Sequence, residues 1–479
     1  MYTISCHLYR QARATLLVCT VLASASAIAQ TSATLPAEVE AALARAKVPV
    51  NAVTVLVTDA DGRAPARLSH RANVPVNPAS IIKLVTTWSA LEMLGPAYAW
   101  STPVFVDGTI SNGTLRGNLH IRGQGDPKLV VERLWLLLRR VQALGINNIA
   151  GDIVLDRSAF ETVQQDPGAF DGEPLRPYNA APDALLLNFK SVIMTFVPDR
   201  TANVAQVSFE PPLAGVQMQQ TVPLTAVDCS DYRGTLKPDF SDPARIRFTG
   251  SYPATCGERS WPVAYADPKS YAARAVEGMW RQSGGKLTGS TREGPVPAGL
   301  KPAFEAQSPP LAEVIRDINK YSNNVMAQQV FLTLSLQQKG AGTLEGSREI
   351  VSRWWRERVG GPAEETPVMD NGSGLSRSER ITANALTRLL QSAWASPMMP
   401  ELMSSLPITG VDGTLKRSRA KTVGAAHLKT GSLNGVTGVA GYVHAAGGRR
   451  YVLVFICNHP NAGAVRPAVD ALIDWAAKE

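Results

Sequence analysis

The chain has 479 residues, of which 45% are hydrophobic and 18% are charged, and its formal net charge is +8. This composition excludes an intrinsically disordered chain, and the length, at roughly 150 residues per domain, predicts about three domains. No basic run is interleaved with aromatic residues, which argues against nucleic-acid binding. The positive charge suits work near an anionic wall or membrane surface, although solubility alone explains it equally well.

The first 29 residues predict a secretory signal peptide. Two arginines precede an apolar run at 14–25, and Ala27-Ile28-Ala29 places small residues where a signal peptidase cuts, before Gln30. The run is shorter than the ~20 apolar residues that span a bilayer. A lipoprotein signal ending at Cys19 is the alternative, but Val18 is bulky where a small residue is expected. We therefore expect a periplasmic protein, whose formal charge falls from +8 to +6 on cleavage because two arginines and no acids are lost.

Hydrophobic periodicity predicts an α/β (α+β) fold built from both ends of the chain, with a β-richer insertion between them. After a helix at 38–46 and a strand at 52–58, Asn77 as N-cap and Pro78 as first helical residue open a buried helix. From about residue 101, short alternating strands separated by Gly and Asn turns mark the insertion. Further helices are predicted at 130–144, 271–283, 311–336, 346–359, 382–394 and 464–477, and further β structure at 149–155, 192–248, 427–444 and 449–458.

Three cysteines follow the predicted signal. Cys229 and Cys256 lie close together in polar, turn-rich sequence, and export permits a disulfide, so we expect these two to pair. Cys457 follows the apolar run 451–456 and is predicted to be a small core residue. No Cys/His cluster has metal-ligand spacing, so we expect neither a metal nor another cofactor.

Ser80-Ile-Ile-Lys83 is the first of three candidate motifs. S-x-x-K occurs three times, starting at Ser80, Ser283 and Ser418, but only Ser80 opens a buried helix. The spacing puts Ser80 and Lys83 on one helix face, and burial lowers the pKa of a lysine so that it can act as a base. The Ser80 N–H, in the first turn, can face the oxyanion of an acyl transfer. Taken alone, an ordinary capped helix with a partly exposed lysine is the better explanation.

Ser322-Asn323-Asn324 interrupts the helix predicted at 311–336. Ser and Asn are poor residues inside a helix because their side chains compete for the backbone. A cap or an exposed turn is one explanation. The functional one is a Ser322 hydroxyl that relays protons and an Asn324 amide that grips the substrate backbone. S-x-N recurs at 432–434, so the motif is weak by itself.

Lys429-Thr430-Gly431-Ser432 occurs once and begins a strand predicted to form a hairpin with 449–458. Gly431 removes side-chain bulk where a ligand backbone can approach, and Lys429 with the two hydroxyls can bind a terminal carboxylate. A strand with a surface lysine would explain this motif alone. The three motifs in this order match the S-x-x-K, S-D-N and K-T-G set of penicillin-binding proteins and class A β-lactamases, and they predict one shared site.

With these motifs, the chain resembles the class C low-molecular-mass penicillin-binding proteins, the D-alanyl-D-alanine carboxypeptidase/endopeptidases. The gap of about 240 residues between Ser80 and Ser322 is far longer than in β-lactamases. In this family it holds two extra domains, one nested in the other. The resemblance covers essentially the whole mature chain and is patchiest at 195–265. Segments that match the family pattern lie at 123–127, 156–160, 178–185, 370–377 and 410–415.

The resemblance implies a penicillin-binding/β-lactamase-like transpeptidase domain, with an antiparallel sheet flanked by helices, and two nested β-rich inserted domains. The implied division is a signal peptide at 1–29, a catalytic domain at 30–98 and 305–479, an inserted domain at 99–194 and 266–304, and a nested domain at 195–265.

The resemblance also implies a serine acyl-enzyme. Ser80 would attack the carbonyl of a D-Ala-D-Ala or D-Ala-diaminopimelate bond in peptidoglycan stem peptides, Lys83 would take its proton, and Ser322 would relay a proton to the leaving amine. The backbone N–H groups of Ser80 and Ser432 would stabilise the oxyanion, and Asn324 would orient the acyl side of the substrate. The third motif, at Lys429, Thr430 and Gly431, would bind the carboxylate end. Asp156 and Arg377 would bind diaminopimelate.

The expected partners are stem peptides as substrate and β-lactam antibiotics as covalent inhibitors, with at most peripheral membrane contact. A homodimer is supported by the resemblance alone. A β-lactamase would share the three motifs, but the chain lacks a Glu-x-x-Leu-Asn segment and has the long insertion. A catalytically idle wall-binding protein is disfavoured because every residue needed for the chemistry is present.

Overall fold

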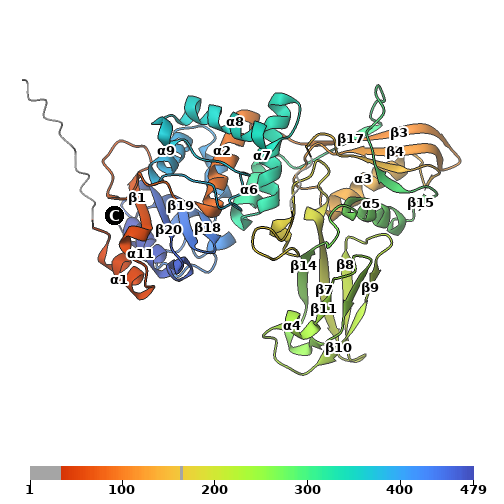
Figure 1. Cartoon of the computed structure of the whole chain (residues 1–479), viewed down its shortest axis with the longest axis horizontal. Helices are drawn as coiled ribbons and strands as arrows, with labels where there is room; N and C mark the ends of the chain where they lie inside the picture. Colours follow the sequence, from red (N-terminus) through yellow and green to blue (C-terminus); the bar gives the residue numbers. More distant parts are fainter. Residues whose placement is uncertain (1–33, 162–165, 479) are drawn as a thin grey trace, which may run out of the picture.

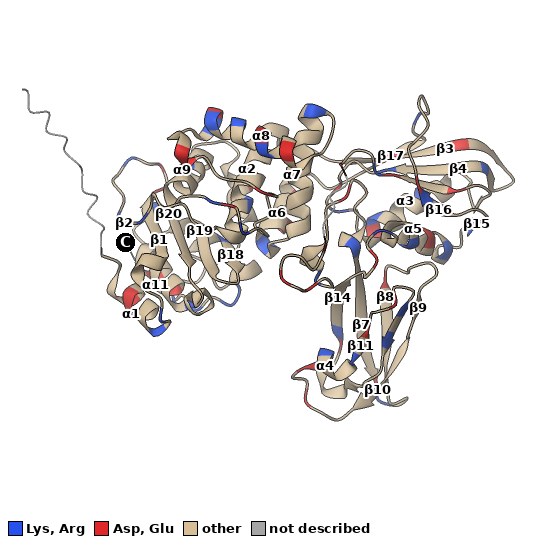
Figure 2. Ribbon diagram, in the orientation of Figure 1, with Lys and Arg blue, Asp and Glu red and all other residues tan. Residues whose placement is uncertain are grey.

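The computed structural model describes residues 34–161 and 166–478, so the predicted signal peptide lies outside the described residues. The chain forms two parts side by side (Figure 1). One part contains a sheet covered by helices and uses both ends of the chain. The other is the β-rich insertion. Acidic and basic residues are interspersed over both parts rather than gathered on one of them (Figure 2).

A five-stranded antiparallel sheet forms the centre of the first part. Its order is β18-β19-β20-β1-β2, so the N-terminal strand β1 lies beside the C-terminal strand β20. Because side chains alternate along a strand, Leu56 and Val454 pack into one helical layer, and Val55 and Phe455 pack into the other. The strands are β1 (Val53–Asp59), β2 (Leu68–His70), β18 (Ala426–Leu433), β19 (Val436–His444) and β20 (Arg450–Asn458).

Helices cover both faces of this sheet, as the sequence predicts. On one face α1 packs against α11, so the first and last helices of the described chain lie side by side (Figure 1). On the other face α2 is buried among the remaining helices. The helices are α1 (Ala37–Arg45), α2 (Lys83–Leu94), α6 (Leu311–Tyr321), α7 (Asn324–Lys339), α8 (Leu344–Trp354), α9 (Ala383–Trp394), α10 (Met399–Ser405) and α11 (Arg466–Ala477).

The strand predicted at 427–444 consists of two strands. Asn434-Gly435 forms the turn between β18 and β19, with Gly435 at a φ of +80°. Asn-Gly is a strong hairpin signal because the favoured two-residue turn needs positive φ. The predicted pairing of the Lys429 strand with the C-terminal strand is therefore wrong, because β19 lies between them. As a result β18 is an edge strand of the sheet.

The helix predicted to begin at Pro78 begins later. Residues 79–82 form a 3-10 turn, and α2 starts at Lys83. The side-chain oxygen of Asn77 accepts a hydrogen bond from the backbone N–H of Ala79 at 2.8 Å, only two residues on. Asn77 thus caps a tight turn rather than an α-helix. Ser80 lies in this turn, between strand β18 and helix α2.

The insertion contains a seven-stranded sheet, against which helices α3 and α5 pack. The strand predicted at 149–155 is divided into two short strands, because residues 150–152 form a bend. The elements of this layer are β3 (Ser101–Ser111), β4 (Thr114–Arg122), β5 (Asn148–Ile149), β6 (Ile153–Asp156), β15 (Lys286–Leu287), β16 (Thr291–Glu293), β17 (Phe304–Gln307), α3 (Val131–Ala143) and α5 (Tyr271–Gln282).

A second β-rich unit projects from this layer (Figure 1). It has a five-stranded sheet of order β13-β10-β8-β7-β14 and a three-stranded sheet of order β11-β12-β9. Its elements are β7 (Ser191–Asp199), β8 (Val204–Glu210), β9 (Gln217–Met218), β10 (Thr221–Thr225), α4 (Tyr232–Leu236), β11 (Pro238–Asp239), β12 (Arg245–Phe248), β13 (Tyr252–Pro253) and β14 (Arg259–Ala264).

A disulfide joins Cys229 to Cys256 in this unit, the pair expected from the sequence, whereas Cys457 is free and buried. The bridge closes a loop with a sequence separation of 27 residues. Replacing both bridged cysteines by serine should lower the free energy of unfolding by about 3 kcal/mol, because the unfolded chain regains the freedom of that loop. Urea unfolding with and without reductant measures this loss. An unchanged midpoint in the variant would contradict the expected stabilisation.

The insertion docks on helix α7. Ala180 and Leu186 pack against Val325. The backbone N–H of Asp183 donates to the side-chain oxygen of Gln329, and the Gln329 amide donates back to the Asp183 carbonyl, both at 2.8 Å. These contacts hold the segment around 178–186 beside the start of α7, where the second motif lies.

Candidate active site

The first motif joins a hydroxyl to a buried amine. Lys83 Nζ donates to Ser80 Oγ at 2.9 Å, to Asn324 Oδ1 at 2.7 Å and to the Ser373 carbonyl. Lys83 is fully buried, whereas Ser80 is half-buried. Burial lowers the pKa of Lys83 from 10.5 to about 7, although the nearby Glu379 carboxylate opposes the shift. An amine with this pKa is substantially neutral near pH 7 and can accept the hydroxyl proton.

The second motif forms the turn between α6 and α7, and the predicted interruption of the helix is confirmed. Ser322 takes the left-handed conformation with a φ of +58°, and Asn323 caps α7 by accepting a hydrogen bond from Met326 N at 3.0 Å. Ser322 Oγ accepts from Lys429 Nζ at 2.9 Å. Asn324 bridges the two parts of the molecule, because its amide nitrogen donates to the Tyr178 carbonyl at 3.4 Å.

The third motif lies on edge strand β18. Lys429 is fully buried, so it is not a surface lysine, and burial together with the charge of Lys83 lowers its pKa well below the usual value. Its amine also donates to the Thr430 carbonyl at 2.7 Å. The hydroxyls of Thr430 and Thr414 are 2.7 Å apart, while Ser432 is exposed. The structure thus brings residues of all three motifs to one place.

Gly431 also meets a requirement of the fold that the sequence does not indicate. A Cβ atom there would lie 2.5 Å from the carbonyl oxygen of Pro78 and 3.0 Å from the Ile81 side chain. A larger residue would push strand β18 away from the turn that holds Ser80. Gly431 lines the cleft as well, so the approach of a ligand backbone to this strand stays a prediction.

A cleft of about 2020 Å³ opens beside the motifs, between the two parts of the molecule. Ser80, Ser322 and Asn324 line it, as does the third motif from Thr430 to Ser432. The two lysine amines are buried against these residues. The opposite wall comes from the insertion, at 170–171 and 177–178. A bound molecule can therefore contact the hydroxyls of the motifs and the insertion at the same time.

Of the two residues expected to bind diaminopimelate, the structure brings only Arg377 to the cleft. The Arg377 guanidinium lies 4.9 Å from the centre of the Phe170 ring and donates to the Asn434 carbonyl at 2.8 Å. Asp156 is buried in the insertion, where it pairs with Arg122 at 2.9 Å. Burial opposes ionisation, but hydrogen bonds from Ser158, Val296 and Arg122 hold the pKa of Asp156 below its usual value. This carboxylate does not line the cleft.

Asp171, one of several carboxylates that line the cleft, lies on the same side as Phe170 and was not identified from the sequence. It is exposed next to Phe170 and accepts hydrogen bonds from Tyr178 Oη at 2.9 Å and from the Asn179 amide at 2.8 Å. Burial opposes ionisation, but these two hydrogen bonds lower the pKa of Asp171. The loop before residue 178 has no periodicity to single out one residue. The only available signal was its nearness to the family-like segment 178–185.

Neither a metal-ligand cluster nor a membrane-spanning helix is found in the described residues. Within residues 34–161 and 166–478, no group of three or more His, Cys, Asp or Glu side chains is placed to hold a metal ion. No helix in the same ranges is long and apolar enough to cross a bilayer.

Comparison with known proteins places this chain in a family. The family model described as the D-Ala-D-Ala carboxypeptidase 3 (S13) family matches residues 35–479. The chain belongs to the S13 family. The S13 chain is similar to the D-alanyl-D-alanine carboxypeptidase of Actinomadura sp. strain R39, with 26% identity over 415 residues, 83% of this chain and 76% of the relative. It is also similar to DacB of Haemophilus influenzae, with 25% identity over 393 residues, 80% of this chain and 81% of the relative.

The fold of this S13 enzyme is shared with a solved structure. Penicillin binding protein 4 (dacB) from Haemophilus influenzae superposes with a TM-score of 0.71 at 22% identity, covering 91% of this chain and 99% of that one. A second structure of that protein, in complex with a β-lactam, has a TM-score of 0.67. The predicted fold class and the resemblance to class C low-molecular-mass penicillin-binding proteins are confirmed. The protein is a peptidase of the D-Ala-D-Ala carboxypeptidase type.

Proposed function

We propose that this S13 enzyme is an exported serine D-Ala-D-Ala carboxypeptidase and/or D,D-endopeptidase that cleaves peptidoglycan stem peptides through an acyl-enzyme on Ser80. The observation that carries the proposal is the hydrogen bond from the buried Lys83 amine to Ser80 Oγ at the wall of the cleft. A nucleophile within hydrogen-bond reach of a base that is neutral at the working pH is the arrangement that acyl transfer needs.

The reaction begins when Ser80 Oγ attacks the D-Ala carbonyl carbon and passes its proton to Lys83. The N–H groups of Ser80 and Ser432 receive the oxyanion. Because Lys429 donates to Ser322 Oγ, the hydroxyl hydrogen of Ser322 is free to move to the leaving amine as the C–N bond breaks, and the proton held by Lys83 replaces it on Ser322. Water then attacks the acyl carbonyl and gives a proton to the neutral Lys83. The ester bond breaks, Ser80 Oγ takes up that proton, and the shortened peptide leaves.

The carboxylate end of the substrate is held at the third motif. A carboxylate bound there favours the protonated form of Lys429, which attracts it, and the hydroxyls of Thr430 and Ser432 donate hydrogen bonds. The amide of Asn324 orients the acyl side. A β-lactam carries a carboxylate next to its reactive amide, so the same groups would accept it, and we propose β-lactams as covalent inhibitors.

Export is supported by two observations. The predicted signal peptide directs the chain out of the cytoplasm, and the Cys229–Cys256 disulfide is typical of an oxidising compartment. We therefore propose a periplasmic location.

At the far side of the cleft, we propose that Asp171 takes the role expected of Asp156. An ammonium and a carboxylate are present together at the free end of a diaminopimelate side chain. Asp171 offers a carboxylate for the first, and Arg377 offers a guanidinium for the second. Phe170 holds the Arg377 guanidinium by stacking.

Asp171→Asn should lower kcat/KM about fivefold for a stem peptide that contains diaminopimelate, the effect of losing one partly exposed charge pair worth about 1 kcal/mol. Acylation by benzylpenicillin, which has no such side chain, should not change. Asp156→Asn is the matched control and should reduce stability without altering this preference. Equal losses on both substrates in Asp171→Asn, or a selective loss in Asp156→Asn, would contradict the assignment.

The activity itself is tested with a pentapeptide ending in D-Ala-D-Ala and with a dimeric cross-linked muropeptide, each followed by mass spectrometry. Loss of one D-Ala shows carboxypeptidase action, and conversion of dimer to monomer shows endopeptidase action. If the enzyme instead leaves both intact and hydrolyses benzylpenicillin with rapid turnover, it is a β-lactamase and the proposal is wrong.

A further inference from the structure

The loop at 370–376 lies against the proposed nucleophile and base. A Cβ atom on Gly374 would lie 2.3 Å from the Ala79 carbonyl oxygen, and one on Gly372 would lie 2.7 Å from the Phe331 ring, so the loop is wedged between the Ser80 turn and α7. Two of its carbonyls accept hydrogen bonds from α2. Gly372 O accepts from Thr86 Oγ1 at 2.7 Å, and Ser373 O accepts from Lys83 Nζ. The position of this loop therefore sets the surroundings of the Lys83 amine.

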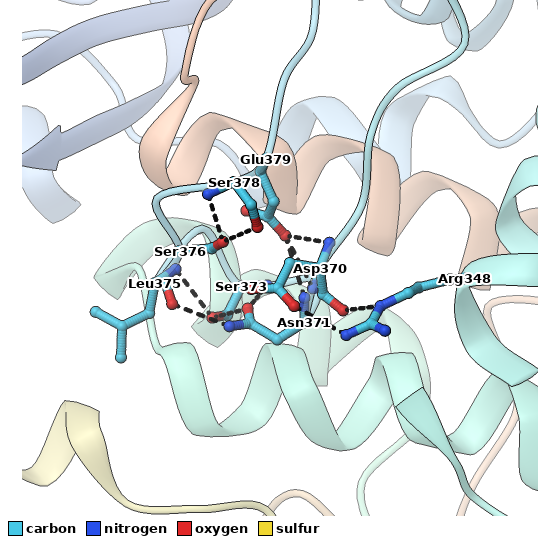
Figure 3. Close-up of polar contacts among 9 residues, drawn as sticks. Arg348, Asp370, Asn371, Ser373, Leu375, Ser376, Ser378 and Glu379 are labelled. Atoms are coloured by element: carbon cyan, nitrogen blue, oxygen red, sulfur yellow. Dashed lines mark hydrogen bonds and ion pairs between the residues drawn. The ribbon is translucent and has the colours of Figure 1, made fainter. Parts of the chain in front are cut away.

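Glu379 holds the start of the loop (Figure 3). One carboxyl oxygen, Oε1, accepts hydrogen bonds from the backbone N–H groups of Asp370 at 3.1 Å, Asn371 at 3.3 Å and Gly372 at 3.2 Å. The side chain is completely buried, and its second oxygen, Oε2, has no hydrogen-bond partner in the described chain. Burying a carboxyl oxygen without a hydrogen-bond partner costs free energy. The three backbone contacts of Oε1 therefore do not by themselves explain why a carboxylate is buried here.

The charged groups around Glu379 come from several elements. Lys83 on α2 is the cation that acts on it, and Asp370 of the same loop is the carboxylate. Asp370 is itself paired with Arg348 on α8 at 2.9 Å. Lys429 on β18 is close enough to Lys83 for the charge of Lys83 to lower the pKa of Lys429. Glu379 is therefore the nearby carboxylate whose charge opposes the loss of the Lys83 proton.

We propose that Glu379 is a positioning residue for Lys83, which holds the 370–374 loop so that the Ser373 carbonyl receives the amine, and supplies the negative charge that stabilises the ammonium formed during acylation. The inference rests on the proposed function, because it takes Lys83 as the base. When Ser80 Oγ gives its proton to Lys83, the new positive charge is buried, and its hydrogen-bond acceptors among the described residues are neutral, namely Ser80, Asn324 and Ser373. A carboxylate nearby lowers the energy of that state.

Burial supports this pairing from both sides. Burial raises the pKa of Glu379 from 4.5 to about 7, and the charge of Lys83 opposes that rise. Burial also lowers the pKa of Lys83 to about 7, and the charge of Glu379 opposes that fall. The two groups thus change charge over the same pH range. The acid side of the rate profile should depend on both.

The test compares rates of acylation by a fluorescent penicillin from pH 5 to 9 in the full chain and three variants. Glu379→Gln keeps an oxygen for the backbone N–H groups but loses the charge. The Lys83 amine should then lose its proton more easily, so the rising limb, the part of the rate–pH curve in which the acylation rate rises, should move about one pH unit lower. The constant rate reached at higher pH should fall about tenfold. Glu379→Asp keeps the charge, so its limb should stay near that of the wild type at a reduced rate. Glu92→Gln, on the same helix as Lys83 but two to three turns away, should leave both unchanged.

The outcomes separate the two proposals. If the wild-type protein forms no adduct on Ser80, the proposed function fails and the role of Glu379 fails with it. If the wild type is acylated but the limb of Glu379→Gln does not move, only the Glu379 inference is overturned. A uniform drop in rate that follows a loss of thermal stability, or failure of both Glu379 variants to fold, would mean that the carboxylate serves folding alone, and would also overturn it.

Discussion

Replacing Ser80 by alanine should reduce acylation by benzylpenicillin at least ~10⁴-fold, because loss of the nucleophile removes the bond-forming step itself. The fold should persist. Ser80 is half-buried, and its hydroxyl accepts a hydrogen bond from Lys83 and donates a long one, at 3.5 Å, to the Ser373 carbonyl. A typical hydrogen bond contributes about 1 kcal/mol to stability. The measurement is the second-order rate of adduct formation, with thermal unfolding recorded in parallel.

Ser283→Ala is the matched control, since Ser283 opens another S-x-x-K sequence but lies at the end of α5 in the insertion. It should be acylated at the wild-type rate. Wild-type rates in Ser80→Ala would move the nucleophile to another residue and remove the basis of the account.

Replacing Lys83 by methionine should lower the acylation rate by ~10²–10⁴-fold, the usual contribution of a general base. Methionine fills a similar volume without an amine. In the wild type the rate should rise with pH through about 7, as Lys83 loses its proton, and this limb should be absent from the residual rate of the variant. Lys286→Met, which alters the lysine of the Ser283 sequence, is the control and should keep the limb. A normal rate and limb in Lys83→Met would show that another group is the base.

The same substitution has a signature in stability. The pKa of Lys83 is lower in the folded chain, at about 7, than its ordinary value of 10.5. Between these values the unfolded chain binds more protons than the folded one, so this group makes the free energy of unfolding rise with pH across that window. Lys83→Met should remove that part of the rise. Urea unfolding at pH 7 and pH 10 measures this rise in the free energy of unfolding. An equal rise in wild type and variant would mean that the amine is not buried as described.

The three motifs could be predicted because each has a local signal. Ser80 and Lys83 lie three residues apart at the start of a buried helix, and Ser322 breaks a long apolar helix with polar residues. The sheet and helices of the first part follow from periodicity over long segments. The late start of α2 could not be predicted, because the tight turn at 79–82 depends on contacts with Gly374 and Gly431, which are far away in sequence.

The residues that the sequence did not identify act through tertiary contacts. Asp156 ends strand β6 in a family-like segment and Asp171 lies in a loop without a motif, but in the folded chain it is Asp171 that lines the cleft. Glu379 follows a family-like segment but has no motif of its own, and its contact with the loop is visible only in the folded chain. The hairpin at Asn434-Gly435 is different, since its turn signal was present in the sequence and was overlooked.

The central claim is that Ser80 is the nucleophile of an acyl-enzyme. It is tested most directly by the intact mass of the mature protein after brief incubation with benzylpenicillin, followed by mapping of the modified peptide. The account predicts one lasting penicilloyl adduct, located on Ser80. An adduct on another residue, or a protein that stays unmodified while the drug remains intact, would contradict it.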